Sequence, residues 1–255
     1  MKSYTMLDVK NLYNEFLSKM KTSSSGVITN YLSYLEYNKY KFIETILAIP
    51  CSSDPLKVLD IGTSIFNLFL KRCFPHYEIA TIDIDNCFEK ECIKRGIIFK
   101  RVDLTKDLIP FKDDTFDIII FSEVFEHLFV HPSKIFGEIY RVLRKDGILI
   151  FTTMNAAMLY KRIKCLFGKP TVGFPIDAVI EKYLHIREYT MQECLDILKN
   201  NNFIIEKSKY SDCWDKLNSQ IPKFGKKYFV PILIYICIVK VIPQFRGDIF
   251  IVCKK

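Results

Sequence analysis

Three aspartates follow one another at intervals of about 20 residues, each at or just after a short apolar run. They are Asp60, Asp83 and Asp103. The interval is about the length of one strand–helix unit, so we expect the side chains at neighbouring strand ends. A carboxylate at the second strand end can accept both hydrogen bonds of a ribose diol, and Asp85 is a near neighbour that could do so instead. The spacing therefore predicts a site for a nucleoside-bearing cofactor.

Two histidines are candidates for taking a proton from a substrate. His127 follows the fourth expected strand, and His185 precedes a helix that begins with a predicted capping box. An ordinary histidine pKa near 6.5 suits a general base. Each side chain could instead have only a packing or capping role. The chain has four histidines and nine cysteines with no metal-ligand spacing, so we expect no metal site.

The elements that must position these residues are alternating strands and helices. Strands are expected at 57–61, 78–83, 97–102, 117–122, 148–153, 203–207 and 248–253. They are rich in Val, Ile, Leu and Phe, as is typical of parallel strands covered on both faces. One helix is expected to begin at His131–Pro132 and to end at Arg144–Gly147, and another opens with the capping box Thr190–Glu193.

Four stretches resemble, in order, motifs of the class I S-adenosylmethionine (SAM) dependent methyltransferases. The first reads Lys57-Val-Leu-Asp-Ile-Gly-Thr-Ser64, and the others are 108–128, which contains Ser-Glu-Val-Phe-Glu-His, 141–153 and 185–190. The similarity is to the small-molecule branch, which includes ubiquinone-type and glycan-modifying O-methyltransferases. It implies an α/β fold: a Rossmann-like, doubly wound, seven-stranded sheet, mostly parallel with an antiparallel last strand, and helices on both faces.

The resemblance also implies roles for individual residues. Asp60, Gly62, Thr63 and Ser64 would hold the methionine end of SAM, Asp83 the ribose, and Asp103 and Leu104 the adenine, with Ile84 as a further cofactor-binding residue. Ser122 and Glu123 would border the sulfonium and the acceptor. Relatives carry two or three glycines in the first turn, whereas only Gly62 remains here. Thr63 and Ser64 are small and can hydrogen-bond a carboxylate.

The expected activity is SN2 transfer of a methyl group to an oxygen of a small-molecule, glycan or lipid-linked acceptor. The fourth strand ends in Ser122-Glu-Val-Phe125 rather than an Asn/Asp-Pro-Pro-aromatic tetrad, which makes nucleic acid an unlikely substrate. The excess of 37 Lys and Arg over 29 Asp and Glu keeps an RNA methyltransferase open as an alternative. The lost glycines keep open a non-catalytic scaffold with the same fold.

The chain is expected to comprise a helical cap at 1–50 and a SAM-binding domain at 51–255 with insertions at 155–189 and 210–247. The apolar stretch 229–243 is too short for a standard transmembrane helix and would either complete the core or contact a bilayer surface peripherally. The unpaired cysteine pattern and the lack of an apolar N-terminal signal favour a cytoplasmic protein. Nothing in the sequence indicates an oligomeric state.

Overall fold

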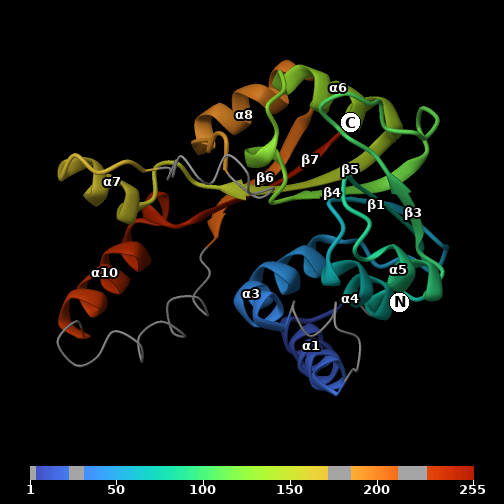
Figure 1. Ribbon diagram of the computed structural model, residues 1–255, viewed down its shortest axis with the longest axis horizontal. Coiled ribbons are helices and arrows are strands. Elements are labelled where there is room, and N and C mark those ends of the chain that lie inside the picture. The colour runs from blue at the N-terminus through green and yellow to red at the C-terminus, as the bar shows by residue number, and fades with distance from the viewer. Residues whose placement is uncertain (1–3, 23–31, 172–184, 212–228) are drawn as a thin grey trace.

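A single seven-stranded sheet organises the molecule (Figure 1). The computed structural model describes residues 4–22, 32–171, 185–211 and 229–255. The strands are β1 (Lys57–Ile61), β2 (Glu78–Asp83), β3 (Ile98–Arg101), β4 (Phe116–Ser122), β5 (Leu143–Met154), β6 (Ile204–Ser211) and β7 (Asp248–Lys254). Their order is β3-β2-β1-β4-β5-β7-β6, and β7 runs antiparallel to both of its neighbours. The expected mostly parallel sheet with an antiparallel last strand is confirmed.

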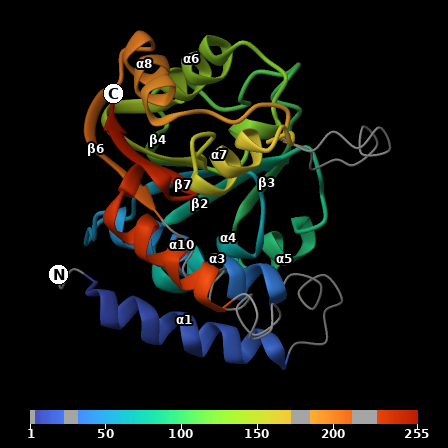
Figure 2. The same ribbon diagram turned by 90° about the vertical axis from the view of Figure 1, so that its left-hand side faces the viewer.

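Helices cover both faces of this sheet. On one face lie α1 (Met6–Lys21), α3 (Leu32–Ala48), α4 (Ile65–Cys73) and α5 (Glu89–Lys94), and on the other lie α6 (Pro132–Val142) and α8 (Met191–Asn200) (Figure 1). Two further helices, α7 (Leu159–Leu166) and α10 (Phe229–Val241), project together from one side of the molecule, as both ribbon views show (Figures 1 and 2).

Alternate residues of the central strands pack into two separate hydrophobic cores, one on each face of the sheet. Val58 and Ile118 pack with the helices of one face, whereas their chain neighbours Leu59 and Ile119 pack with α6 and α8. All four side chains are at most 1% exposed. A slip of one residue would exchange the two cores, so burial fixes the register. The carboxyl ends of β1, β2 and β4 are thereby held at one edge of the sheet.

The N-terminal helices belong to the same core as the sheet face beneath them. Tyr13 of α1 is fully buried and lies in the hydrophobic cluster that contains Val58. Glu44 of α3 accepts hydrogen bonds of 2.6 Å from both Lys209 and Ser211 of β6. The division into a cap at 1–50 and a separate domain stays a prediction, and α1 and α3 themselves pack directly on the sheet.

The helix before β5 ends earlier than the sequence suggests. We expected Arg144–Gly147 to terminate it, but α6 ends at Val142 and β5 already begins at Leu143. The pairing of β4 with β5 shifts register between Phe116 and Ile118, and Asp146 adopts a positive φ of 60°. The four residues that we interpreted as a helix stop therefore form an irregular start of a strand.

The capping box at Thr190 is confirmed. The Glu193 backbone N–H donates to Thr190 Oγ1 (3.3 Å), and the Thr190 N–H donates to Glu193 Oε2 (2.8 Å). This reciprocal pair satisfies two backbone donors at the start of α8. It fixes the end of the segment that carries His185.

The apolar helix α10 is not a wholly buried core segment. Leu233, Ile234 and Val241 are 49%, 56% and 79% exposed, whereas Val239 is buried. Among the described residues, no helix is long and apolar enough to cross a bilayer. The helix therefore contributes an apolar surface as well as a contact with the rest of the protein.

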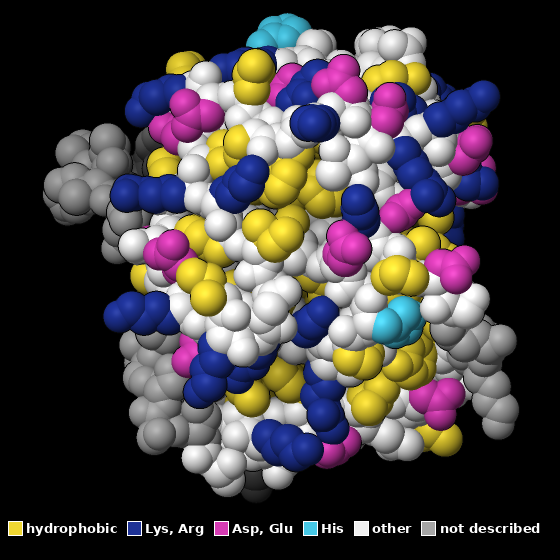
Figure 3. Space-filling view, turned by 90° about the vertical axis from the view of Figure 1, so that its right-hand side faces the viewer, with side chains coloured by type: hydrophobic (Ala, Val, Ile, Leu, Met, Phe, Trp, Pro, Cys, Tyr) yellow, Lys and Arg dark blue, Asp and Glu magenta, His cyan; other side chains and the backbone are white. Residues whose placement is uncertain are grey.

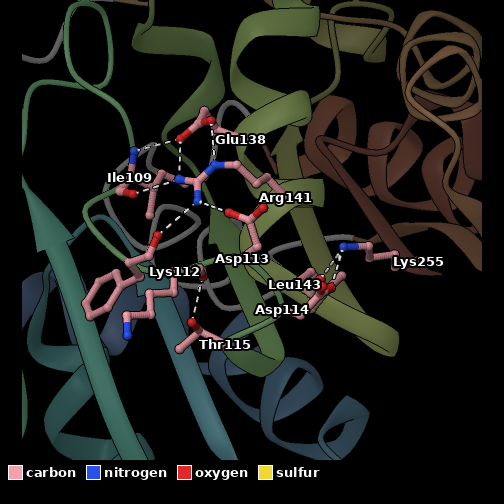
Figure 4. Close-up of polar contacts among 10 residues, drawn as sticks. Ile109, Lys112, Asp113, Asp114, Thr115, Glu138, Arg141, Leu143 and Lys255 are labelled. Carbon is pink, nitrogen blue, oxygen red and sulfur yellow. Dashed lines mark hydrogen bonds and ion pairs between the residues drawn. The ribbon is translucent and has the colours of Figure 1, made fainter.

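Arg141 ties α6 to the loop that precedes β4 (Figure 4). Its guanidinium donates to both carboxylate oxygens of Glu138 at 2.9 and 2.8 Å and to the carbonyl oxygens of Ile109 and Phe111 at 2.9 Å. It also pairs with Asp113 at 2.7 Å. Only the planar fork of arginine can serve all these acceptors at once.

We expect Arg141→Lys to lower the free energy of unfolding by about 2 kcal/mol, because a single ammonium leaves two carbonyls and part of Glu138 without donors. Urea unfolding followed by circular dichroism measures the change. Lys112→Ala, which removes an exposed cation from the same loop, should change stability by less than about 0.5 kcal/mol. Equal stability of Arg141→Lys and the wild type would contradict this role.

Candidate functional site

The turn after β1 requires a glycine at one position. Gly62 has a φ of +94°, and a Cβ on it would lie 2.4 Å from Cγ2 of Val124. Its N–H donates to the carbonyl oxygen of Ile82 at 2.9 Å. A side chain at this position would be strained by the backbone and would clash. Gly62 is the only glycine in the turn, and the close approach of Val124 after β4 requires a glycine at this position.

Thr63 joins the turn to the end of β2. Its N–H donates to Asp83 Oδ2 at 2.6 Å, and its hydroxyl lies 2.8 Å from that of Thr81. The other oxygen of Asp83 accepts the N–H of Asp85 at 2.8 Å. A carboxylate can accept about four hydrogen bonds, so both oxygens keep capacity for a ligand. Burial raises the pKa of Asp83, and the two backbone donors oppose that effect.

Ser64 starts α4 and connects the turn to Asp60. Its hydroxyl accepts the N–H of Phe66 at 3.1 Å, and its own N–H donates to Asn67 Oδ1 at 2.8 Å. The amide nitrogen of Asn67 donates in turn to Asp60 Oδ2 at 2.8 Å. Asp60 is 2% exposed, and this burial raises its pKa well above the ordinary value. Hydrogen bonds from Thr63 and Ser64 therefore stabilise a turn that contains a single glycine.

The residues expected around an adenine lie on neighbouring strand ends. The N–H of Val102 donates to the carbonyl oxygen of Asp83 at 2.8 Å, which places Asp103 beside the end of β2. Asp103 accepts the N–H and the hydroxyl of Thr105 at 3.0 and 2.6 Å and pairs with Lys106 at 3.0 Å. The Thr105 bonds and Lys106 lower its pKa.

The apolar candidates on these strand ends differ in exposure. Ile84 is 55% exposed, and Leu104 is 8% exposed. Asp85 caps its own loop by accepting the N–H of Cys87 at 2.8 Å. Ile84 is thus accessible to a ligand at the sheet edge, whereas Asp85 has a local structural role.

The end of β4 carries a buried ion pair with the N-terminal cap. Glu123 has a positive φ of 54°, and its Oε2 lies 3.0 Å from Nζ of Lys41 on α3. Lys41 also lies 3.5 Å from Asp248 of β7. Burial raises the pKa of Glu123, and Lys41 opposes that shift. Ser122 and Glu123 both contact Thr152 of β5, at 2.6 and 3.2 Å.

Glu126, His127 and His185 come together beside this ion pair. Glu126 and His127 lie in the short 3₁₀ helix η1 (Phe125–His127), and the N–H groups of Ile186 and Arg187 donate to the carbonyl oxygen of Glu126 at 2.7 and 3.2 Å. The rings of His127 and His185 are 4.8 Å apart, centroid to centroid. The two histidines that the sequence singled out are therefore neighbours.

A second carboxylate and a buried lysine support His185. Its Nδ1 lies 2.8 Å from Oε1 of Glu188, and Glu188 also pairs with Lys161 at the start of α7. Burial, with smaller effects from His127 and two lysines, lowers the pKa of His185 to about 4. Burial also lowers the pKa of Lys161 to about 8 and raises that of Glu126 to about 8. His185 is therefore neutral at physiological pH.

Our sequence analysis missed several members of this cluster. Glu126 lies inside the Ser-Glu-Val-Phe-Glu-His run. Its position three residues after Glu123 was the only sequence feature that could have indicated it as a site residue. Lys41, Lys161, Glu188 and Asp248 reach the cluster from distant parts of the chain, so no local pattern could have indicated them.

Comparison with known proteins identifies the fold. Residues 59–151 match the family model described as a methyltransferase domain. The fold is the class I methyltransferase fold. The crystal structure of a SAM-dependent methyltransferase from Mesorhizobium loti superposes with a TM-score of 0.57 at 14% identity, covering 86% of this chain and 98% of that one.

Two curated proteins are similar over part of the chain. Phthiotriol/phenolphthiotriol dimycocerosates methyltransferase 1 of Mycobacterium ulcerans is 30% identical over 91 residues, which are 34% of this chain and 32% of the relative. Malonyl-[acyl-carrier protein] O-methyltransferase of Paenibacillus sp. is 29% identical over 108 residues, 39% of each chain. The chain thus spans roughly a third of the length of these relatives.

We expect Gly62→Ala to lower the free energy of unfolding by about 3 kcal/mol, since it combines backbone strain with the contact on Val124. Gly96→Ala is the matched control: Gly96 also has a positive φ, of 69°, but nothing lies within 4 Å of its added Cβ. Its cost should be about 1 kcal/mol. Urea unfolding compares the two, and Val124→Ala should partly rescue Gly62→Ala. Equal costs at both glycines would show that the close approach is unimportant.

Proposed function

We propose that this protein is a SAM-dependent methyltransferase that methylates an oxygen of a small-molecule, glycan or lipid-linked acceptor. The observation that carries the proposal is the turn at Gly62, which is hydrogen-bonded to Asp83 at the end of the neighbouring strand. This edge of an open α/β sheet is where such folds bind nucleotide-like ligands. The match of residues 59–151 to a methyltransferase domain supports the same reading.

The residues present are chemically suited to SAM. Asp83 retains acceptor capacity for a ribose diol, and Gly62 leaves room for a close approach of the ligand. The start of α4 provides the positive end of a helix dipole for the methionine carboxylate. Ile84, Asp103 and Leu104 are the proposed adenine-side residues.

The main contribution of the protein to the proposed reaction is to align the acceptor with SAM, and no covalent bond to the protein is required. A lone pair of the acceptor oxygen forms a bond to the methyl carbon, the carbon–sulfur bond breaks, and the sulfur keeps the electron pair. The proton of that oxygen is taken up by a base, for which His127 and His185 are the candidates, or by solvent. Bound SAM supplies the activated methyl group, and the chain orients the two reactants. We propose Ser122 and Glu123 as the border between them, with His127 and His185 on the acceptor side.

Separate observations support two features of the proposed acceptor, its reactive oxygen and its apolar portion. The Paenibacillus relative is an O-methyltransferase by name. Helix α7 begins near the histidines, where Lys161 pairs with Glu188, and ends in Leu166 and Phe167, which are 82% and 75% exposed. These apolar side chains, together with those of α10 on the same side of the molecule (Figure 2), suit an acceptor with a lipid portion or a peripheral membrane contact.

An RNA substrate is the second candidate, because the net charge is +8. On the face shown in Figure 3, however, acidic side chains are interspersed among the basic ones. A binding face for nucleic acid is usually a continuous basic patch. This face therefore gives the RNA alternative no support.

We expect SAM to bind the wild-type protein and Asp83→Asn to bind it at least about tenfold more weakly, because a charged acceptor of the ribose hydroxyls is lost. Isothermal titration measures both affinities. Asp54→Asn is the control, since Asp54 is exposed and precedes β1 at the opposite edge of the sheet. Absence of binding to the wild type at millimolar SAM would refute the cofactor assignment. Unchanged binding to Asp83→Asn would refute the role of that residue.

We also expect methyl transfer from labelled SAM to hydroxyl-bearing acceptors, and none to RNA. A panel of glycan, quinol and lipid-linked hydroxyl compounds tests the first part, with RNA and an amine series as controls. Affinity for RNA that falls steeply between 50 and 200 mM salt, as expected when about 6–10 phosphates are contacted, would favour the alternative. Transfer only to amines would contradict the oxygen assignment.

A further inference from the structure

The cluster of Glu126, His127 and His185 has the composition of a metal site. Each residue offers one donor atom, and these atoms all lie within 4.8 Å of one another. In a tetrahedral site with donors at about 2.1 Å from the cation, neighbouring donors lie about 3.4 Å apart. Side-chain movements of about an ångström would therefore close the site around an ion.

Glu126 has an unused acceptor inside this cluster. The residue is 1% exposed, and its Oε2 accepts the hydroxyl of Thr153 at 2.8 Å. Its Oε1 is buried without a hydrogen-bond partner among the described residues. A buried carboxylate oxygen without a partner is costly, and a ligand at this position would remove the cost.

His185 is held in the orientation that a metal ligand needs. Glu188 pairs with Lys161 through Oε2 and is therefore a carboxylate, which can only accept hydrogen bonds. The Nδ1 of His185, 2.8 Å from Oε1 of Glu188, is thus the donor, and the lone pair of the ring is on Nε2. A carboxylate that orients a histidine in this way commonly supports a metal-binding imidazole.

The charges around the cluster are unbalanced. Four carboxyl groups, those of Glu123, Glu126, Glu188 and Asp248, lie together with only two lysines, Lys41 and Lys161. All six side chains are largely buried. A divalent cation would compensate the excess negative charge in a region where solvent cannot.

We propose that Glu126, His127 and His185 bind one divalent cation of the first transition series. Two imidazoles and one carboxylate suit Mn²⁺, Fe²⁺, Co²⁺ or Zn²⁺ better than Mg²⁺ or Ca²⁺, which prefer oxygen ligands. Three protein ligands leave open positions, as in catalytic rather than structural sites. This proposal differs from our expectation from sequence, which was that the chain holds no metal.

The role of the cation in the reaction rests on the proposed function, whereas its binding does not. An acceptor oxygen in an open coordination position would lie beside Glu123 at the strand edge, and the positive charge would lower the pKa of its hydroxyl. The proton then passes to solvent. His127 and His185 would serve as ligands rather than as general bases.

The test is titration of the chelator-treated, full-length protein with Co²⁺ in the absence of SAM and acceptor. We expect one Co²⁺ per chain, with a visible absorption band from nitrogen coordination. His127→Ala and His185→Ala should each weaken binding by about a hundredfold or more. The two other histidines of the chain give the matched controls His76→Ala and His131→Ala, which should bind as the wild type does.

Two results would overturn the site: no stoichiometric Co²⁺ binding by the wild type, or unchanged binding in both histidine variants. The side chain of His185 is 31% exposed, so its removal leaves the fold intact, and circular dichroism checks this. If the protein binds Co²⁺ but not SAM, the proposed methyltransferase function is refuted and the proposed metal site stands. If it binds SAM but not Co²⁺, the metal site is refuted and the methyltransferase function stands.

Discussion

Parallel pairing of β1 with both β2 and β4 brings the carboxyl ends of three strands to one edge of the sheet, and the candidate site residues depend on that edge. The register of strand pairing is maintained because alternate residues of each strand pack into two different hydrophobic cores. Gly62 lets the strand ends approach, and the hydrogen bond from Thr63 to Asp83 then closes the turn. Polar groups that are far apart in sequence become neighbours as a result of apolar packing.

The same edge carries an unusual amount of buried charge. Lys41 of α3 and Lys161 of α7 both reach it, and the carboxyl groups there outnumber these two lysines. Such an arrangement is expensive for folding unless it serves a ligand. Apolar residues in these places would give a more stable protein, so the cluster is better understood through binding than through stability.

Sequence alone predicted the sheet well, since each strand is a short apolar run followed by turn residues, and the assignment of strand-end residues to a cofactor stays a prediction. Prediction from the sequence failed where the structure depends on contacts between residues that are far apart in the chain. The start of β5 was misjudged because Arg144–Gly147 has the composition of a helix stop, whereas Leu143 already pairs with Phe116 of β4 and the register shifts before Ile148 pairs with Ile118. The carbonyl oxygen of Glu126 accepts hydrogen bonds from the N–H groups of Ile186 and Arg187, about 60 residues later in the chain, and no periodicity reveals such a pairing. The apolar sequence of α10 suggested burial, whereas several of its side chains face solvent.

The attachment of α3 has a consequence for how molecules reach the site. Lys41 links this helix to Glu123 and Asp248, and Glu44 links it to β6, so moving it would break buried ion pairs and open a hydrophobic core together. Entry of a ligand by displacement of α3 would have to break these contacts together, so access at another part of the strand edge requires less disruption. A substitution on the buried face of α3 would then alter the surroundings of Glu123 as well as the core.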